Sequence, residues 1–401
     1  MFLALAALAS AALKPILFVH GHGGVKTYAN VTVGNKCQTY KKQQFQAWPV
    51  DEETAKKEVE CITFALEAST NTTDNSTIHH SGVHIELGGL SDMDVFQPIL
   101  PFLEQKGYVR EKTLFGFSYD WTLYPAGTPN LISDFMAQVE TIRDQADEKV
   151  IVVAHSLGAH VIDYIMTAES KWFSKNIFRV IYNAPALYGC FAPFSNIPKK
   201  KFSSLTGSAA AIMASKMPSL HAMFNNYVVF KDQYTFTNTR DGNITAENVT
   251  NFLRNKDFML SEATRIFKQV EPTLQRQPSS PVVPTLVLFN SGINTTVVAY
   301  DTDDFLDVYG KGDGVCQATG PQYMCNNLDR VECVDWNQTN STLWNHNGML
   351  AQEEAFKKVY AFANPPEDLR PLMYALIALC VVAFIALIAL IVLIIICKRR
   401  S

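Results

Sequence analysis

The sequence has little charge and almost no imbalance of sign. Only 18% of its 401 residues are charged, and the formal net charge is −4 with a pI near 6.2. Such a chain gives no electrostatic reason to expect nucleic acid as a partner. Internal repeats, acidic tails and long low-complexity runs are also missing from the sequence. The length therefore allows one large α/β domain with insertions, or two domains at most.

Charge is missing altogether from one long stretch near the C-terminus, Leu372 to Ile396. At about 1.5 Å per residue, a helix of this length exceeds the roughly 30 Å hydrocarbon core of a bilayer. Three basic residues follow it, and the positive-inside tendency places such a tail in the cytosol. We therefore expect a linker at 365–371, a transmembrane helix at 372–397 and a cytosolic tail at 398–401.

The N-terminus lacks a basic region, but its first residues are apolar and small, which favours a short signal peptide at 1–12. Eight N-x-S/T triplets without a central proline agree with entry into the secretory pathway. They begin at Asn30, Asn71, Asn75, Asn243, Asn248, Asn294, Asn337 and Asn340. The expectation is a single-pass type I membrane protein of the plasma membrane or the endolysosomal system, with its globular domain lumenal or extracellular. Without a working signal, the C-terminal helix would instead be a tail anchor on a cytosolic domain.

Two of the eight cysteines, Cys380 and Cys397, fall in the predicted membrane helix. The other six can form three disulfides in several pairings, or remain buried thiols. These six are Cys37, Cys61, Cys190, Cys316, Cys325 and Cys333.

Short apolar runs alternate with helical patterns through residues 13–364, which predicts a mostly parallel sheet in an open α/β fold. The runs that indicate strands are 16–19, 113–117, 149–154, 178–182 and 284–289. The segments with helical spacing are 95–106, 131–146 and 157–168. Two segments leave this alternation: a polar excursion at 37–80, and a mixed segment at 194–277 that we interpret as a cap.

Ser156 stands between a predicted strand and a predicted helix, in the sequence Ala154-His155-Ser156-Leu157-Gly158. A nucleophile at such a point needs a sharp turn, and small residues two positions away on either side let the strand and helix pack closely. The segment therefore predicts a nucleophile elbow. The alternative is a serine in an ordinary strand-to-helix turn.

A serine nucleophile needs a general base and an orienting carboxylate, which follow it in this kind of fold as Asp or Glu and then His. Three histidines lie downstream. His160 is one turn along the elbow helix, and His221 falls among apolar cap residues where a packed histidine is expected. His346, in a loop before the last helix of the globular part, is the predicted base.

Asp313 is the predicted carboxylate because flanking glycines allow a tight turn around it. The competing acids would belong to a solvated loop; they are Asp301, Asp303, Asp304 and Asp307. For the oxyanion hole we expect the backbone N–H groups of Leu157 and of Gly23, in the glycine-rich loop after the first strand.

The same loop contains His20 and His22, which suggest a metal site. Three more histidines, His79, His80 and His84, would be needed to complete it. No cysteine or acid lies at ligand spacing nearby, so we predict neither a metal nor another cofactor.

Together these motifs resemble the lecithin:cholesterol acyltransferase and lysosomal phospholipase A2 family. The matching stretches are Phe18 to Gly21, Tyr119 to Trp121, Val153 to Ser156, Gly312 to Gly314, and His346 to Leu350. The resemblance implies an α/β-hydrolase fold over residues 13–364. It also implies an enzyme that attacks the acyl ester of a glycerophospholipid, and that passes the acyl group to water or to a lipid alcohol at a membrane surface.

The resemblance further implies a Cys37–Cys61 disulfide that closes a lid around Trp48, and a role for Asp120 and Trp121 on the substrate side. The chain departs from the family at three positions: Thr122 stands in place of Arg, His20 in place of Pro, and Gly23 in place of a bulkier residue. The acyl-ester chemistry is therefore expected to carry over better than the choice of headgroup or acceptor.

Two other functions stay open. One is a neutral-lipid or sterol-ester lipase with the same three catalytic residues, which competition between phospholipid and triacylglycerol donors would separate. The other is a non-catalytic surface interaction protein on a hydrolase scaffold, and the presence of Ser156, Asp313 and His346 argues against it.

Overall fold

The computed structural model describes residues 13–33, 36–40, 42–238, 242–249, 251, 261–300, 306–365 and 382. The predicted signal peptide, the linker beyond Pro365, the membrane helix apart from Val382, and the tail lie outside these residues. Within them, the longest helix, α5 (Leu131–Ala146), has 16 residues, whereas a bilayer span needs about 20. No described helix is both long and apolar enough to cross a membrane. This finding corrects the expectation of a single-pass type I membrane protein, which was based on the apolar stretch, the basic residues after it, the predicted signal peptide and the eight glycosylation triplets.

Six parallel strands form the central sheet, as the alternation of apolar runs and helices predicted. In spatial order they are β17 (Val331–Asp335), β14 (Thr285–Phe289), β9 (Ile177–Asn183), β8 (Val150–His155), β1 (Ile16–Val19) and β7 (Leu114–Phe117). Every residue of β1, β8 and β14 is buried. Strands covered on both faces need continuous apolar sequence rather than alternation, which is why these runs were recognisable.

The order of the strands reverses between β1 and β8. After β1 the chain adds β7 on one side, whereas after β8 it adds β9, β14 and β17 in turn on the other side. The loops that follow β1 and β8 therefore diverge, and the carboxyl ends of these paired strands, Val19 beside Ala154, border a crevice. In open α/β sheets, ligands bind at such a reversal point.

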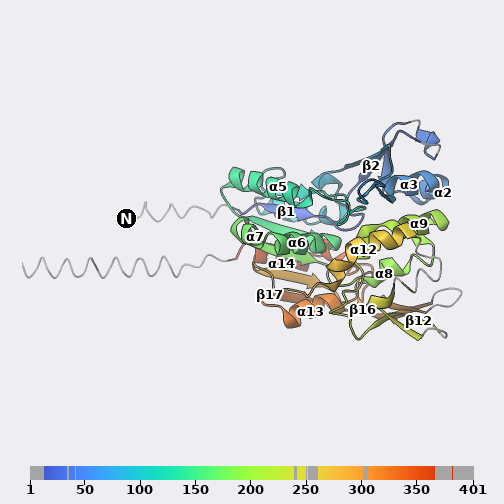
Figure 1. The fold of residues 1–401 in the computed structure, drawn as a ribbon. Helices are drawn as coiled ribbons and strands as arrows, with labels where there is room; N and C mark the ends of the chain where they lie inside the picture. The colour runs from blue at the N-terminus through green and yellow to red at the C-terminus, as the bar shows by residue number, and fades with distance from the viewer. Residues whose placement is uncertain are drawn as a thin grey trace, which may run out of the picture. The chain divides into compact units, whose positions relative to one another are not determined.

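Helices cover the sheet and fill the connections (Figure 1). Besides α5 they are α2 (Glu52–Lys57), α3 (Val59–Leu66), α4 (Leu100–Gln105), α6 (Leu157–Ala168), α7 (Ser170–Asn176), α8 (Phe191–Ser195), α9 (Ser208–Lys216), α10 (Pro218–Ala222), α12 (Ser261–Gln275), α13 (Thr319–Asn327) and α14 (Glu353–Ala363). The α5 stripe packs Phe135, Val139 and Ile142 inward, as its helical spacing predicted. Single turns of 3₁₀-helix occur at Gln38–Tyr40, Leu90–Asp92, Asp94–Phe96, Ala246–Asn248 and Met349–Ala351.

Smaller sheets lie outside the central one. They are β3 (Phe45–Trp48), β2 (Thr27–Val31) and β6 (Val83–Leu87); β4 (Ala68–Thr70) and β5 (Thr77–His79); β10 (Lys201–Phe202) and β11 (Leu205–Thr206); and β13 (Gly242–Thr245), β12 (Tyr234–Asn238), β15 (Ile293–Tyr300) and β16 (Leu306–Gly312). The segment 37–80, called the lid segment below, and the segment 194–277, called the cap segment, supply several of these strands.

The lid and cap segments are in contact with each other. Figure 1 shows α2 and α3 of the lid segment beside α9 of the cap segment. Lys216 at the end of α9 is 9% exposed and forms ion pairs with Glu67 of the lid segment at 2.6 Å and with Glu262 of α12 at 2.7 Å. The Lys216–Glu67 pair connects the cap segment to the lid segment, whereas the Lys216–Glu262 pair lies within the cap segment.

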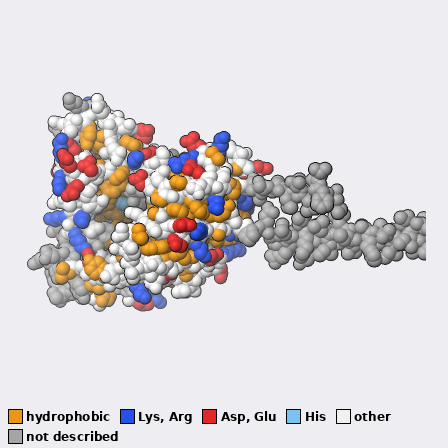
Figure 2. All heavy atoms as spheres, turned by 180° about the vertical axis from the view of Figure 1, so that it is seen from behind, with side chains coloured by type: hydrophobic (Ala, Val, Ile, Leu, Met, Phe, Trp, Pro, Cys, Tyr) orange, Lys and Arg blue, Asp and Glu red, His pale blue; other side chains and the backbone are white. Residues whose placement is uncertain are grey.

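Three disulfides join cysteines of the described region: Cys37–Cys61, Cys190–Cys316 and Cys325–Cys333. The first pair, in the lid segment, is the one that the resemblance implied. Figure 2 shows one face of the molecule, where acidic and basic side chains are interspersed rather than gathered by sign, in keeping with the small net charge.

Candidate active site

Ser156 occupies a sharp turn between β8 and α6, with φ 53° and ψ −121°. A non-glycine residue is held in such a conformation only when its surroundings fix it, and this is a feature of functional sites. Two glycines make the packing possible. A β-carbon on Gly158 would lie 2.6 Å from the carbonyl oxygens of Val19 and His20, and one on Gly21 would lie 2.7 Å from the β-carbon of Ser156. The elbow is thus pressed directly against the glycine-rich loop that follows β1.

His346 bridges the serine and the aspartate that the sequence selected. Its Nε2 lies 2.8 Å from Oγ of Ser156, and its Nδ1 lies 2.8 Å from Oδ2 of Asp313. The three side chains are 6%, 6% and 3% exposed. Since Nδ1–H donates to the carboxylate, Nε2 is left with a lone pair toward the serine hydroxyl, which is the arrangement required of a general base.

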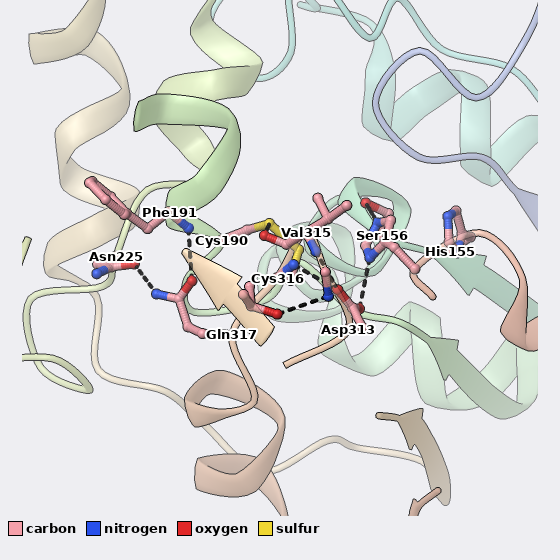
Figure 3. Close-up of a disulfide and its surroundings, with 12 residues drawn as sticks. His155, Ser156, Cys190, Phe191, Asn225, Asp313, Val315, Cys316 and Gln317 are labelled. Atoms are coloured by element: carbon pink, nitrogen blue, oxygen red, sulfur yellow. Dashed lines mark hydrogen bonds and ion pairs between the residues drawn. A yellow bond between two sulfur atoms is a disulfide. The ribbon is translucent and has the colours of Figure 1, made fainter. Parts of the chain in front are cut away.

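Asp313 is held by its own turn at the end of β16. Its Oδ1 accepts the backbone N–H groups of Val315 at 3.0 Å and Cys316 at 2.7 Å, so that Oδ2 points to His346. Figure 3 shows this turn beside the Cys190–Cys316 disulfide. Of the competing acids, Asp307 pairs with Lys199 of the cap segment, and positions 301, 303 and 304 lie outside the described residues.

The two competing histidines have other surroundings. His160 Nδ1 lies 2.7 Å from the hydroxyl of Tyr124, and His221 is enclosed between the rings of Phe194 and Phe267. Burial lowers the pKa of both histidines to about 3. Both are therefore packed, neutral core histidines at neutral pH, and the interpretation of His221 as a packed cap residue agrees with this.

His155 and Asn347 are site residues that the sequence analysis did not identify. Nδ1 of His155 accepts from Asn183 Nδ2 at 3.1 Å, and its Nε2 lies 3.3 Å from Oδ1 of Asn347. The His155 and His346 rings are 4.9 Å apart between centroids. Burial, and then the proximity of His346, lower the pKa of His155 to about 3, so it stays neutral beside the base. A signal was available, since these two residues directly neighbour Ser156 and His346 in the chain.

The two predicted oxyanion positions flank the elbow. Leu157 is the first residue of α6, so its N–H has no acceptor one turn earlier in the helix and is free to face a ligand. Gly23 has φ +61°, and its carbonyl oxygen accepts the indole N–H of Trp48 at 2.7 Å. A β-carbon at Gly23 would lie 2.6 Å from that indole nitrogen. Trp48 can therefore pack tightly over the loop only because the bulkier residue of the family is absent here.

A cleft of about 400 Å³ opens at this point. The Ser156 and His346 side chains lie at it together with Trp48 and the loop after β1. Its described lining residues are His22, Gly23, Gly24, Val25, Lys26, Trp48, Pro49, Asp92, Asp94, Val95, Pro98, His155, Ser156, His346 and Asn347. Of the expected substrate and lid residues, Trp48 thus lies at the cleft.

Trp121 packs against two cleft-lining rings, those of His22 at 4.7 Å and Trp48 at 5.8 Å between centroids, whereas Asp120 does not line this cleft. Trp121 is fully buried, with its indole N–H 2.9 Å from Oγ1 of Thr27. Asp120 lines a separate cavity of about 250 Å³ and contacts His79 Nε2 at 2.7 Å and Thr122 Oγ1 at 2.6 Å. Burial alone would raise the pKa of Asp120, but the neighbouring His79 and these hydrogen bonds lower it below its usual value. Thr122, which replaces the family's Arg, is therefore a hydrogen-bond partner of the buried acid.

Known proteins resemble this chain at the level of family and fold. A family model described as lecithin:cholesterol acyltransferase matches residues 84–280, which include Ser156 but not Asp313 or His346. Phosphatidylcholine-sterol acyltransferase of Gallus gallus is 24% identical over 268 residues, which are 61% of this chain and 63% of that protein. The chain thus matches less than two thirds of the length of this relative.

Two solved structures are similar in architecture. The Tle4-Tli4 complex matches 87% of this chain and 98% of its own chain, with 8% identity and a TM-score of 0.50. The mature form of the lipase BlEst2 of Bacillus licheniformis matches 89% of this chain and 95% of its own, with 12% identity and a TM-score of 0.37. At 8% identity, the similarity to the Tle4-Tli4 complex concerns the fold alone.

Proposed function

Because the chain belongs to the lecithin:cholesterol acyltransferase family, we propose that it is a serine-dependent enzyme that cleaves the acyl ester of glycerophospholipids and passes the acyl group to water or to a lipid alcohol. The observation that carries this proposal is the hydrogen-bonded series from Ser156 Oγ through His346 to Asp313, at a cleft in an α/β-hydrolase fold. Each of the three groups has the neighbour that its role requires.

In the first half-reaction, Oγ of Ser156 attacks the carbonyl carbon of the acyl ester while Nε2 of His346 takes the hydroxyl proton. Asp313 stabilises the resulting imidazolium through Nδ1–H. The carbonyl oxygen becomes an oxyanion, and the N–H of Leu157 and one of the loop containing Gly23 donate to it. Collapse of this intermediate breaks the ester bond, and His346 returns the proton to the oxygen of the departing lysophospholipid.

The second half-reaction reverses these roles. Water or a lipid alcohol gives its proton to His346 and attacks the acyl group on Ser156, so the products are a free fatty acid or a new ester and the regenerated serine. The chemistry is identical for both acceptors, and their ratio depends on how much water the cleft excludes. The lid segment, whose Trp48 lies at the cleft, is the element placed to control it.

The polar wall of the cleft favours a phospholipid donor over a neutral lipid. Lys26, Asp92 and Asp94 line the same cleft as Ser156, and Lys26 Nζ donates to Asp92 at 3.0 Å. A triacylglycerol or sterol ester has no group that pairs with such charges, and covering them would cost free energy. A zwitterionic phospholipid headgroup carries both a phosphate, which pairs with Lys26, and a cation, which pairs with Asp92 or Asp94.

The test is release and transfer of labelled acyl chains from phospholipid liposomes that contain a lipid alcohol, with the full chain as enzyme. Ser156→Ala should remove both products, whereas Ser133→Ala, which removes only an exposed hydroxyl that donates to the Asn130 carbonyl oxygen at 2.9 Å, should retain them. Competing triacylglycerol should reduce the signal only weakly. Equal signals from wild type and Ser156→Ala, from acid to neutral pH, would reject the catalytic proposal in favour of an interaction protein.

A further inference from the structure

The Cys190–Cys316 disulfide joins the turn of Asp313 to the residue that immediately precedes α8 (Figure 3). Cys316 is the residue whose backbone N–H donates to Oδ1 of Asp313 at 2.7 Å, and its carbonyl oxygen accepts the Asp313 N–H at 3.2 Å. Cys190 immediately precedes α8 and donates its own N–H to Met223 at 2.7 Å. Both cysteines are buried, at 1% and 3% exposure. The disulfide thus links Cys316, which donates a hydrogen bond to Asp313, to the backbone that precedes α8.

A second connection runs parallel to the disulfide. The side chain of Gln317, 1% exposed, accepts the backbone N–H of Phe191 at 2.9 Å and donates to Oδ1 of Asn225 at 2.7 Å. Phe191 and Asn225 lie close to Cys190 and Met223 in the chain. Residues 316 and 317 are therefore fixed to the same two pieces of backbone, one covalently and one by buried hydrogen bonds.

The other bonds on this turn hold its backbone rather than the Asp313 carboxylate: the Gly314 N–H donates to Oγ1 of Thr295 at 2.8 Å, and the His346 N–H donates to the Asp313 carbonyl oxygen at 2.9 Å. Gly312 and Gly314 flank Asp313, and Gly314 has φ +92°. Glycine loses more conformational freedom on folding than any other residue, so an untethered turn of this kind samples other arrangements. A β-carbon at Gly312 would lie 2.4 Å from the carbonyl oxygen of Cys316, which means that the close approach of Cys316 depends on this glycine.

We propose that the Cys190–Cys316 disulfide, with Gln317, is a positioning device for the catalytic acid: it holds the Cys316 N–H on Asp313 and thereby directs the carboxylate to His346. This inference rests on the proposed serine mechanism. It assigns to Cys190, Cys316 and Gln317 a role in turnover that acts through Asp313. The Cys325–Cys333 disulfide, which joins α13 to β17 across eight positions, contacts none of these groups among the described residues and serves as the internal comparison.

The experiment compares two paired variants of the full chain, Cys190→Ala/Cys316→Ala and Cys325→Ala/Cys333→Ala, on labelled phospholipid liposomes. The first pair should lower kcat by about 10- to 100-fold with KM unchanged, because a displacement of catalytic groups by about 1 Å has effects of that size. The second pair should lower the melting temperature without this loss of kcat. Equal kcat values for the two paired variants would overturn the proposal.

A double-mutant cycle separates positioning from general stability. In an Asp313→Asn background the first pair should change the residual kcat by less than about twofold, since the group through which it acts is already altered. An unchanged 10- to 100-fold loss in that background would show that the disulfide acts independently of Asp313 and would reject the inference. If Ser156→Ala is instead as active as the wild type, the proposed function itself is rejected.

If the first pair does not fold, Gln317→Leu decides the question, because it removes only the hydrogen-bonded connection. A fall in kcat at constant KM that disappears in the Asp313→Asn background supports the proposal. If Gln317→Leu has the wild-type kcat and the disulfide variant does not fold, then the disulfide and Gln317 contribute to stability alone. That result contradicts the proposal.

Discussion

Gly21 lies so close to Ser156 that a β-carbon added to the glycine would meet the serine's own β-carbon at 2.7 Å. The loop after β1 and the elbow after β8 therefore interlock at the reversal point of the sheet. Gly21→Ala should displace the serine from His346 or push the loop outward. We expect kcat to fall at least about tenfold in the liposome assay, because the reacting groups leave their aligned positions.

The matched control for this substitution is Gly89→Ala. A β-carbon at Gly89 would meet no described atom within 4 Å, and its φ of −92° suits alanine. This variant should retain wild-type kcat and melting temperature. Equal activity of the two variants would mean that the contact at Gly21 does not constrain the serine.

Asp313→Asn should keep the fold but lower kcat by about three to four orders of magnitude, because an amide favours the wrong tautomer of the base and does not stabilise its cation. Asp307→Asn is the matched control: it alters an acid of the same strand that pairs with Lys199 of the cap segment. Its activity should stay within about twofold of wild type, because this half-buried pair is not part of the hydrogen-bonded series from Ser156 through His346 to Asp313. The opposite ranking of the two variants would move the catalytic acid to Asp307.

The contact between His155 and Asn347 predicts a coupled pair behind the base. His155→Phe and Asn347→Ala should each lower kcat by about tenfold, because each releases the loop that follows His346, and the double variant should be no worse than either single one. Multiplied losses in the double variant would show that the two side chains act separately. Measuring the steady-state kcat of the wild type, the two single variants and the double variant in one assay completes this double-mutant cycle.

Trp48→Phe removes the 2.7 Å hydrogen bond to the Gly23 carbonyl but keeps an aromatic ring over the loop. The loop should become less ordered, and kcat should fall several-fold, because the half-buried Gly23 carbonyl loses its donor. Trp172→Phe, which loses a similar bond to Glu140 on the surface, should leave kcat unchanged. Identical kcat values for both variants would place the Trp48 hydrogen bond outside catalysis.

The sequence was sufficient to predict those strands and catalytic residues that depend on local chemistry. Strands β1, β8 and β14 are buried on both faces, so their apolar runs stood out, and Ser156 needed only its strand, its helix and Gly158 to be recognised. Asp313 and His346 followed from chain order and from the flanking glycines. Of the other two downstream histidines, His160 was expected on the elbow helix and His221 among packed cap residues, and the structure places both in packed surroundings.

Other features depend on packing that no local pattern reveals. β17 is the edge strand of the sheet and is only partly buried, so its residues did not form an apolar run. The cap segment was described as helical and polar by turns, but its β12 pairs in parallel with β15, more than fifty positions later in the chain. The substrate-side role that the resemblance implied for Asp120 and Trp121 stays a prediction: Asp120 contacts His79, and Trp121 donates to Thr27 beside the cleft-lining Trp48.

Buried histidines give the protein a specific dependence of stability on pH. Burial lowers the pKa of His221 to about 3 and that of His20 to about 4; the pKa values of His155 and His160 are lowered to about 3 as well. An unfolded histidine binds a proton near pH 6.5. Between pH 6.5 and the folded pKa, the unfolded state therefore holds more protons. The stabilisation is complete above pH 6.5 and is lost progressively as the pH falls toward 3–4.

His221→Leu tests this linkage because the residue lies in the cap segment among apolar rings. Each buried neutral histidine contributes a slope of about 1.4 kcal/mol per pH unit over its window, so the variant should gain roughly 2 kcal/mol relative to wild type between pH 7 and pH 5. Urea unfolding at the two pH values measures this difference. Met223→Leu, a neighbouring buried substitution without a titrating group, should shift stability equally at both. If His221→Leu changes the free energy of unfolding by the same amount at both pH values, then His221 has the same protonation in the folded and unfolded states. Burial would then not keep this histidine neutral.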